Sequence, residues 1–159
     1  MILYLDTSAL VKIYADEEGT ETVERAIDEA EAVATSVVAY AEARAALARK
    51  LREGVFSPEE HREAAEALEE DWETLDTPEV THALARRAGG LAEEYALRGF
   101  DAIHLASALL VREAHSEQTD VPTEEAVLFL GFDSNLTAAA GRVMQVYEQA
   151  EDPNGRNPS

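Results

Sequence analysis

A carboxylate and two hydroxyls, on Asp6, Thr7 and Ser8, directly follow the short apolar run Ile2–Leu5. The run predicts a buried parallel strand, and the apolar pattern that resumes after Ser8 predicts a helix. In open α/β sheets, ligands bind at the edge where the strands end and the helices begin. Alternatively, Asp6 or Ser8 only caps the helix, because either side chain can accept hydrogen bonds from its first backbone N–H groups. Chemistry at this edge therefore requires further polar groups from elsewhere in the chain.

Two more aspartates occupy comparable positions in the sequence. Asp133 follows the apolar run 126–132, which predicts another buried strand, and Asp101 follows a Gly-Phe turn and precedes a strongly helical stretch. Capping is the alternative for both, since aspartate is strongly preferred at helix N-caps. If these aspartates do more than cap helices, we expect them to meet Asp6 at one edge of the sheet.

Glu42 differs from the aspartates because it lies inside the alanine-rich run 37–53, which predicts a helix. Its neighbours three and four positions away are apolar, which places its carboxylate on an apolar helix face. A buried carboxylate has to be paired, protonated or bound to a cation. The alternatives are an ion pair with Arg49 or a position near the helix edge.

Together, Asp6, Glu42, Asp101 and Asp133 would form a cluster of four carboxylates. Like charges at short range raise the pKa of acids, and a hard divalent cation relieves the repulsion. The chain has no cysteine and no histidine cluster, so an all-oxygen site favours Mg²⁺ or Mn²⁺ over zinc. With one or two ions, such a site can activate a water and neutralise phosphate oxygens in phosphodiester cleavage. The metal would also let an acidic protein act on an acidic polymer.

Five other side chains near these motifs are expected to serve the fold. His104 lies one turn into its predicted helix and is more typical of a core histidine, or of one behind the site, than of a ligand. Arg44 and Arg98 are expected to form surface pairs, and Tyr40 and Phe100 to lie in the core.

Predicted strands and helices alternate along the chain, which favours an α/β fold with a mainly parallel sheet between helix layers. Besides 2–5 and 126–132, short strands are predicted at 33–35 and 73–76, with an edge strand at 142–147. Predicted helices begin near residues 9, 20, 37, 58, 77 and 102, with Thr20, Ser36 and Ser57 as caps, and a short helix covers 136–140. Residues 1–148 are expected to form one domain, with a mobile loop at 116–125 and a disordered tail at 149–159.

The composition is strongly acidic, with 33 acidic against 13 basic residues and a net charge of −20. This charge disfavours phosphate backbones and anionic membranes as nonspecific partners, and it is typical of a surface adapted to high salt. No apolar run approaches the ~20 residues of a membrane span, and the N-terminus lacks the basic region of a secretory signal. A cytoplasmic protein is therefore expected, and it has only two lysines, Lys12 and Lys50.

Four segments resemble the motif regions of a known family: LDTSALVK, YAEARAAL, GFDAIHLASAL and FLGFDSNLTAAA. In order, spacing and flanking residues they are similar to the PIN-domain ribonucleases, in particular to the VapC-type toxins of type II toxin–antitoxin pairs. The resemblance covers residues 1–147. It implies a three-layer α/β/α sandwich, Mg²⁺- or Mn²⁺-dependent cleavage of RNA to 5′-phosphate and 3′-hydroxyl ends, a homodimer, and inhibition by a VapB-type antitoxin.

The resemblance also implies roles for individual residues. Asp6 and Asp101 match the principal metal ligands, while Glu42 and Asp133 match the acids that complete the metal shell or position the water. Ser8 matches the hydroxyl that supports the carboxylates. Two features depart from the family: Gly131 stands where a threonine or serine is common, and the segment 113–125 is longer than usual.

Three other functions remain as alternatives at this point. A phosphatase with Asp6 as its nucleophile usually needs a second acid two residues on, where this chain has Ser8. A PIN fold that binds RNA or protein without catalysis would not need to keep all four acids. A receiver-like module that binds one Mg²⁺ fits less well, because both lysines occur early in the chain.

Overall fold

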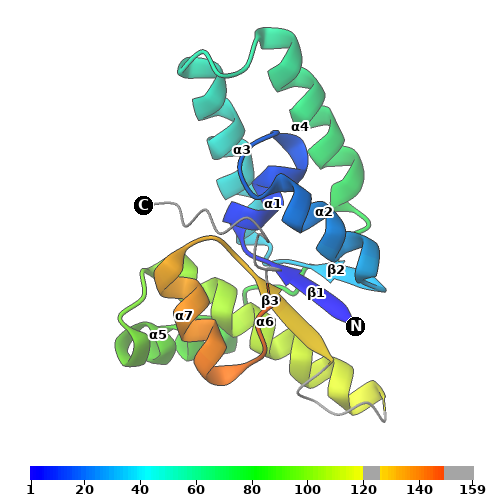
Figure 1. The fold of residues 1–159 in the computed structure, drawn as a ribbon. Helices are drawn as coiled ribbons and strands as arrows, with labels where there is room; N and C mark the ends of the chain where they lie inside the picture. Colours follow the sequence, from blue (N-terminus) through cyan, green and yellow to red (C-terminus); the bar gives the residue numbers. More distant parts are fainter. Residues whose placement is uncertain (120–125, 149–159) are drawn as a thin grey trace, which may run out of the picture.

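A parallel sheet of three strands forms the centre of the computed structural model, which describes residues 1–119 and 126–148 (Figure 1). The strand order is β2-β1-β3, with β1 at Ile2–Leu5, β2 at Ala32–Ala34 and β3 at Val127–Leu130. The central strand β1 pairs in parallel with both neighbours, and Leu3 lies opposite Val33 on one side and Leu128 on the other. The predicted parallel sheet is confirmed.

Seven helices occur in the described ranges, and they cover both faces of the sheet (Figure 1). They are α1 (Thr7–Tyr14), α2 (Thr20–Glu29), α3 (Val38–Arg52), α4 (Pro58–Trp72), α5 (His82–Tyr95), α6 (Gly99–Gln118) and α7 (Ser134–Val143). Leu3 and Leu5 of β1 pack with α1 to α4, whereas Tyr4 points to the opposite face and packs with α5 to α7. Side chains alternate along a strand, so β1 divides its apolar residues between two cores. The expected three-layer α/β/α sandwich is confirmed.

Two of the predicted strands are wrong. In the segment 73–76, Thr74 and Leu75 donate backbone hydrogen bonds back to the end of α4, so only Asp76 is left to pair, through a single parallel bridge to Ala34. In the segment 142–147, helix α7 continues to Val143 and only Val146 forms a bridge with β3. Both segments lie next to a helix end, and a short apolar pattern of this kind fits the end of a helix as well as it fits a short strand.

Several helix boundaries also differ from the predictions. Thr20 does not cap α2, because Gly19 holds the cap position at φ 93° and the Thr20 hydroxyl donates to backbone carbonyls at the end of α1. Helix α5 begins at His82 with Thr81 as its cap, not at residue 77, since the bridge at Asp76 keeps the preceding chain extended. Residues 116–118 belong to α6 rather than to a loop.

Other boundary predictions are confirmed. Ser57 and Glu60 form a reciprocal capping box at the start of α4. Helix α3 ends before Gly54, which has a φ of 75°, as predicted. The predicted cap Ser36 is wrong, because Val37 holds the cap position of α3, although the Ser36 hydroxyl accepts a hydrogen bond from the Val38 N–H at 3.4 Å. The rest of the predicted loop, 120–125, and the predicted tail lie outside the described residues. Within the described ranges, no helix combines the length and apolar character needed to cross a membrane.

Candidate active site

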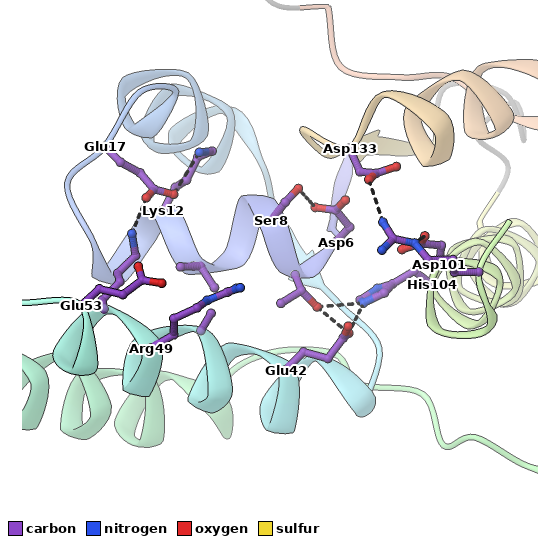
Figure 2. Close-up of a pocket in the computed structure, with 15 residues that line it drawn as sticks. Asp6, Ser8, Lys12, Glu17, Glu42, Arg49, Glu53, Asp101, His104 and Asp133 are labelled. Atoms are coloured by element: carbon purple, nitrogen blue, oxygen red, sulfur yellow. Dashed lines mark hydrogen bonds and ion pairs between the residues drawn. The ribbon is translucent and has the colours of Figure 1, made fainter. Parts of the chain in front are cut away.

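A cavity of about 590 Å³ opens at the carboxyl edge of the sheet, and all five predicted site residues line it (Figure 2). Asp6 and Ser8 come from the β1–α1 junction, Glu42 from α3, Asp101 from α6 and Asp133 from the start of α7. Parallel strands end at the same edge, so chain segments far apart in sequence deliver their carboxylates to one place.

Asp6 both caps α1 and faces the cavity. Its side chain is only 2% exposed, and its Oδ1 atom accepts hydrogen bonds from the Ala9 N–H at 2.9 Å and the Ser8 hydroxyl at 2.6 Å. The Ser8 oxygen in turn accepts the Phe132 N–H at 2.8 Å, which ties the β3–α7 connection to Asp6. Burial raises the pKa of the Asp6 carboxyl above its ordinary value, although these hydrogen bonds oppose the shift. Capping occupies Oδ1 and leaves Oδ2 outside the cap.

Gly131 approaches Asp6 more closely than any other residue type could. A Cβ atom at this position would lie 2.5 Å from Asp6 Oδ2 and 3.1 Å from the Phe129 ring. With Asp6 in this position, a threonine or serine at 131 would require Asp6 or the turn to shift. The Thr137 hydroxyl instead donates to the Gly131 carbonyl at 3.2 Å and holds this turn from the α7 side.

Glu42 is held by a buried hydrogen-bonded network that the sequence analysis did not predict. Its Oε1 atom accepts the Thr7 hydroxyl at 2.7 Å and lies 2.9 Å from His104 Nε2. His104 is 2% exposed, and its Nδ1 atom lies 3.1 Å from the Tyr4 hydroxyl. A neutral imidazole that carries its proton on Nε2 satisfies all these contacts, since Tyr4 then donates to Nδ1.

The contacts of Glu42 correct one alternative and confirm another prediction. Glu42 pairs with His104 rather than with Arg49. Partial burial acts to raise the pKa of Glu42, but the hydrogen bonds from His104 and Thr7 outweigh it and keep the pKa below its ordinary value. His104 lies behind the site, as expected. The sequence placed His104 one turn after Asp101, but it carried no signal for its pairing with Glu42, which lies 62 residues away.

Asp101 and Asp133 face each other across Arg98. The Arg98 guanidinium lies 3.4 Å from Asp101 Oδ2 and 3.6 Å from Asp133 Oδ2, and its side chain is 84% exposed. Asp133 caps α7 by accepting the Leu136 N–H at 2.9 Å. The capping alternative is wrong for Asp101, because Arg98 holds the cap position of α6 and Asp101 lies in its first turn. Burial and the charge of Asp133 raise the pKa of Asp101.

The donor chemistry of the cavity fits a hard divalent cation. In the part of the chain that the structure describes, no three acidic or histidine side chains are gathered tightly enough to hold an ion as they stand. The four carboxylates nevertheless share one cavity, and the raised pKa values of Asp6 and Asp101 reflect burial and mutual repulsion. Arg98 partly offsets this repulsion. An all-oxygen set of this kind suits Mg²⁺ or Mn²⁺, after rotation of the partly exposed Asp101 and Asp133 side chains.

The expectations for the remaining neighbours are met in part. Arg44 forms a surface pair with Glu69 and contacts Tyr40. Tyr40 is half-buried and its ring packs edge-on against Trp72. Phe100 is 57% exposed, so its predicted place in the core is wrong. The buried residues of α6 begin at Ala102, and Phe100 precedes them in the first turn, where its side chain faces solvent.

Comparison with known proteins places this geometry in context. Residues 3–141 match the PIN domain family. The chain is 39% identical over 110 residues to ribonuclease VapC45 of Mycobacterium tuberculosis (strain CDC 1551 / Oshkosh) and to ribonuclease VapC49 of Mycobacterium tuberculosis (strain ATCC 25618 / H37Rv). Each alignment covers 69% of this chain and 76% of the relative. The region matched to the family contains all five predicted site residues.

Proposed function

This chain belongs to the PIN-domain family, and from that membership we propose that it is an endoribonuclease that depends on Mg²⁺ or Mn²⁺. The observation that carries the proposal is the convergence of Asp6, Glu42, Asp101 and Asp133 on one cavity at the carboxyl edge of the sheet. The names of the VapC ribonucleases support RNA as the substrate.

In the proposed mechanism, Asp6 and Asp101 would hold the cation, and Glu42 and Asp133 would complete the ligand set or position the attacking water. When bound, a divalent ion supplies the positive charge that activates water and neutralises phosphate oxygens. Ser8 fixes the orientation of the Asp6 carboxylate through the 2.6 Å hydrogen bond to Oδ1. The hydrogen bond from Thr7 and the contact with His104 keep Glu42 ionised and fixed in place, which suits a carboxylate that binds a cation or orients a water.

The biological role follows from the same relatives. We propose that the chain is the toxin of a type II toxin–antitoxin pair, acts in the cytoplasm as a homodimer, and is inhibited by a VapB-type antitoxin. Co-expression with the product of the neighbouring small gene, followed by co-purification and an RNA-cleavage assay, tests this role. An antitoxin is expected to restore growth and to suppress cleavage.

Cleavage of total RNA by the purified protein, with and without Mg²⁺ or Mn²⁺ and at high salt, tests the chemistry. Asp6→Asn and Asp101→Asn are expected to abolish metal-dependent cleavage, because each removes a charge from the proposed ligand set. Asp28→Asn is the matched control, since Asp28 is exposed on α2 and lies outside the cavity. Product ends should be 5′-phosphate and 3′-hydroxyl.

Full metal-dependent cleavage by both site variants would refute the assignment. Binding of RNA without cleavage by the wild-type protein would favour a PIN fold kept for binding alone. A phosphorylated Asp6 trapped with a small phosphoester would instead favour the aspartyl phosphatase.

A further inference from the structure

Both lysines of this chain line the same cavity as the four carboxylates. In a protein with 33 acidic and 13 basic residues, Lys12 and Lys50 lie together in the cavity, and Arg49 joins them. Figure 2 shows Lys12 and Arg49 toward one end of the cavity, away from Asp101 and Asp133 at the other. The cavity therefore has an acidic end and a basic end.

Two helices produce this separation of charge. On α3 and its C-cap, the residues that line the cavity are Glu42, Ala46, Arg49, Lys50 and Glu53. Ala46 and Lys50 follow Glu42 at intervals of four, which places these three on one helix face, with Arg49 beside Lys50. Lys50 follows Glu42 by eight residues, or about 12 Å along the helix axis at ~1.5 Å per residue. Lys12 follows Asp6 by six residues along α1, or about 9 Å. An RNA strand that lies along the cavity with one phosphate at the acidic end would bring a nearby phosphate of its backbone close to the lysines.

One carboxylate holds both lysines in place. Lys12 Nζ lies 3.0 Å from Glu17 Oε1, and Lys50 Nζ lies 2.6 Å from Glu17 Oε2. Their side chains are 12% and 20% exposed and both line the cavity, and the Lys12 ammonium also lies 4.5 Å from the centroid of the Phe132 ring. Each ammonium has three N–H donors, and one shared carboxylate cannot use all six. Counting Arg49 and Glu53 as well, the basic end keeps a net charge of +1 (three cations, two anions).

Fold stability explains part of this arrangement. Both lysines lie in the last turns of their helices, where cations interact favourably with the helix dipole. Glu17 also ties the α1–α2 turn to α3. These roles account for the ion pairs but not for the position of both lysines in the lining of the cavity that contains the proposed metal ligands.

We propose that Lys12 and Lys50, together with Arg49, form a phosphate-binding subsite for the RNA backbone beside the bond that is cut. This inference rests on the proposed ribonuclease function and names how its substrate is held. With a net charge of −20, the surface as a whole repels RNA, so the strand depends on local cations to lie in the cavity. Contacts to phosphate position a strand without reading its sequence.

Binding of RNA, measured separately from cleavage, tests the subsite. The probe is a short fluorescent single-stranded RNA, and its anisotropy is followed over a range of KCl concentrations with full-length protein carrying Asp101→Asn in Mg²⁺. Lys50→Gln and Arg49→Gln are expected to weaken binding several-fold for two unrelated RNA sequences. Each should also change the slope of log affinity against log salt, relative to the parent, by about 0.7 for one lost contact to a single strand.

Arg52→Gln is the matched control, because Arg52 lies in the same last turn of α3 but does not line the cavity. It should leave both affinity and slope unchanged, and Lys50→Arg should restore what Lys50→Gln loses. If Arg49→Gln and Lys50→Gln bind RNA with the same affinity and the same salt slope as the control Arg52→Gln, the subsite is overturned. A lower Tm and weaker binding without a change in slope would also overturn it, because that result makes Lys50 only a brace for the fold.

Parallel cleavage assays on the wild-type background keep this inference separate from the ribonuclease itself. If the wild-type protein binds RNA with the expected slopes but does not cleave it, the phosphate subsite stands and the nuclease assignment fails. If it cleaves RNA while the variants bind like the parent, the nuclease stands and the subsite fails.

Discussion

At the scale of single residues, the backbone at Gly131 sets the position of the most buried carboxylate in the cavity. A Cβ atom there would fall 2.5 Å from Asp6 Oδ2, well inside van der Waals contact. Asp6 has little freedom to move, because its other oxygen accepts the Ala9 N–H and the Ser8 hydroxyl. Either Asp6 or the β3–α7 connection would have to shift to admit a larger residue.

Gly131→Ala is therefore expected to lower metal-dependent RNA cleavage on the order of 10²-fold, the cost of misplacing a reacting group by about 1 Å. Steady-state cleavage rates and thermal unfolding measure the two consequences separately. Gly89→Ala is the control, since nothing lies within 4 Å of a Cβ at Gly89 inside α5. It should keep full activity and raise the free energy of unfolding by about 1 kcal/mol. A Gly131→Ala variant that cleaves RNA at the rate of the wild type would contradict the steric argument.

The four acids of the cavity could be singled out because each stands in a local pattern that can be recognised alone: an acid after an apolar run or a Gly-Phe turn, or an acid among alanines. Ser8 was singled out by the family resemblance. Thr7, His104 and Arg98 could not be assigned in this way. Their roles depend on which helix faces meet across the cavity. Glu42, for example, contacts Thr7 and His104, which lie 35 and 62 residues away in the sequence, and such distant contacts leave no local pattern. Local sequence patterns therefore indicate the proposed ligands, whereas tertiary packing supplies the groups that hold them.

At the scale of elements, the sequence predicts the long amphipathic helices and the strand β1 well. It fails for the two short segments that adjoin helix ends, 73–76 and 142–147. The four apolar residues Ile2–Leu5 fit only a short strand, because the polar residue Asp6 follows them directly. The segments 73–76 and 142–147 each adjoin a helix end, so hydrogen bonds from that helix compete with pairing to the sheet. Each of them contributes only one bridge. The turn between α1 and α2 is held by the ion pairs of Glu17 with Lys12 and Lys50.

Glu17→Gln is expected to destabilise the protein at neutral pH but not in acid. Hydrogen bonds from Lys50 and Lys12 outweigh partial burial and hold the pKa of Glu17 below its ordinary value. A lowered folded-state pKa contributes stability above the unfolded value of about 4.3, and this contribution disappears as pH falls through the lowered pKa. Urea unfolding of the wild type and the variant from pH 7 to pH 3 should therefore give midpoints that converge in acid.

Glu24→Gln controls for the loss of one negative charge, because Glu24 is exposed in the middle of α2. Its unfolding midpoint should stay close to that of the wild type at neutral pH. A difference between wild type and Glu17→Gln that persists unchanged at pH 3 would show that Glu17 acts through packing rather than through charge.

At the scale of the whole molecule, the sandwich folds against its own charge. The two cores on either side of β1 are apolar and alanine-rich, while the net charge of −20 is spread over the helices that cover them. Charges of one sign repel each other more in the compact state than in the extended chain, so the repulsion lowers stability. Dissolved salt shortens its range, from a Debye length of about 10 Å at 0.1 M to about 3 Å at 1 M.

The Tm of the full chain is therefore expected to rise with added salt, most steeply below about 1 M, where the Debye length changes most. Differential scanning calorimetry in KCl and in NaCl should give matching curves, because screening depends on ionic strength and not on which cation supplies it. The subsite variant Lys50→Gln should follow the same curve shape, since it changes the net charge only from −20 to −21. A Tm that is flat with ionic strength, or that rises with one cation alone, would mean that specific ion binding rather than general repulsion governs the stability of this fold.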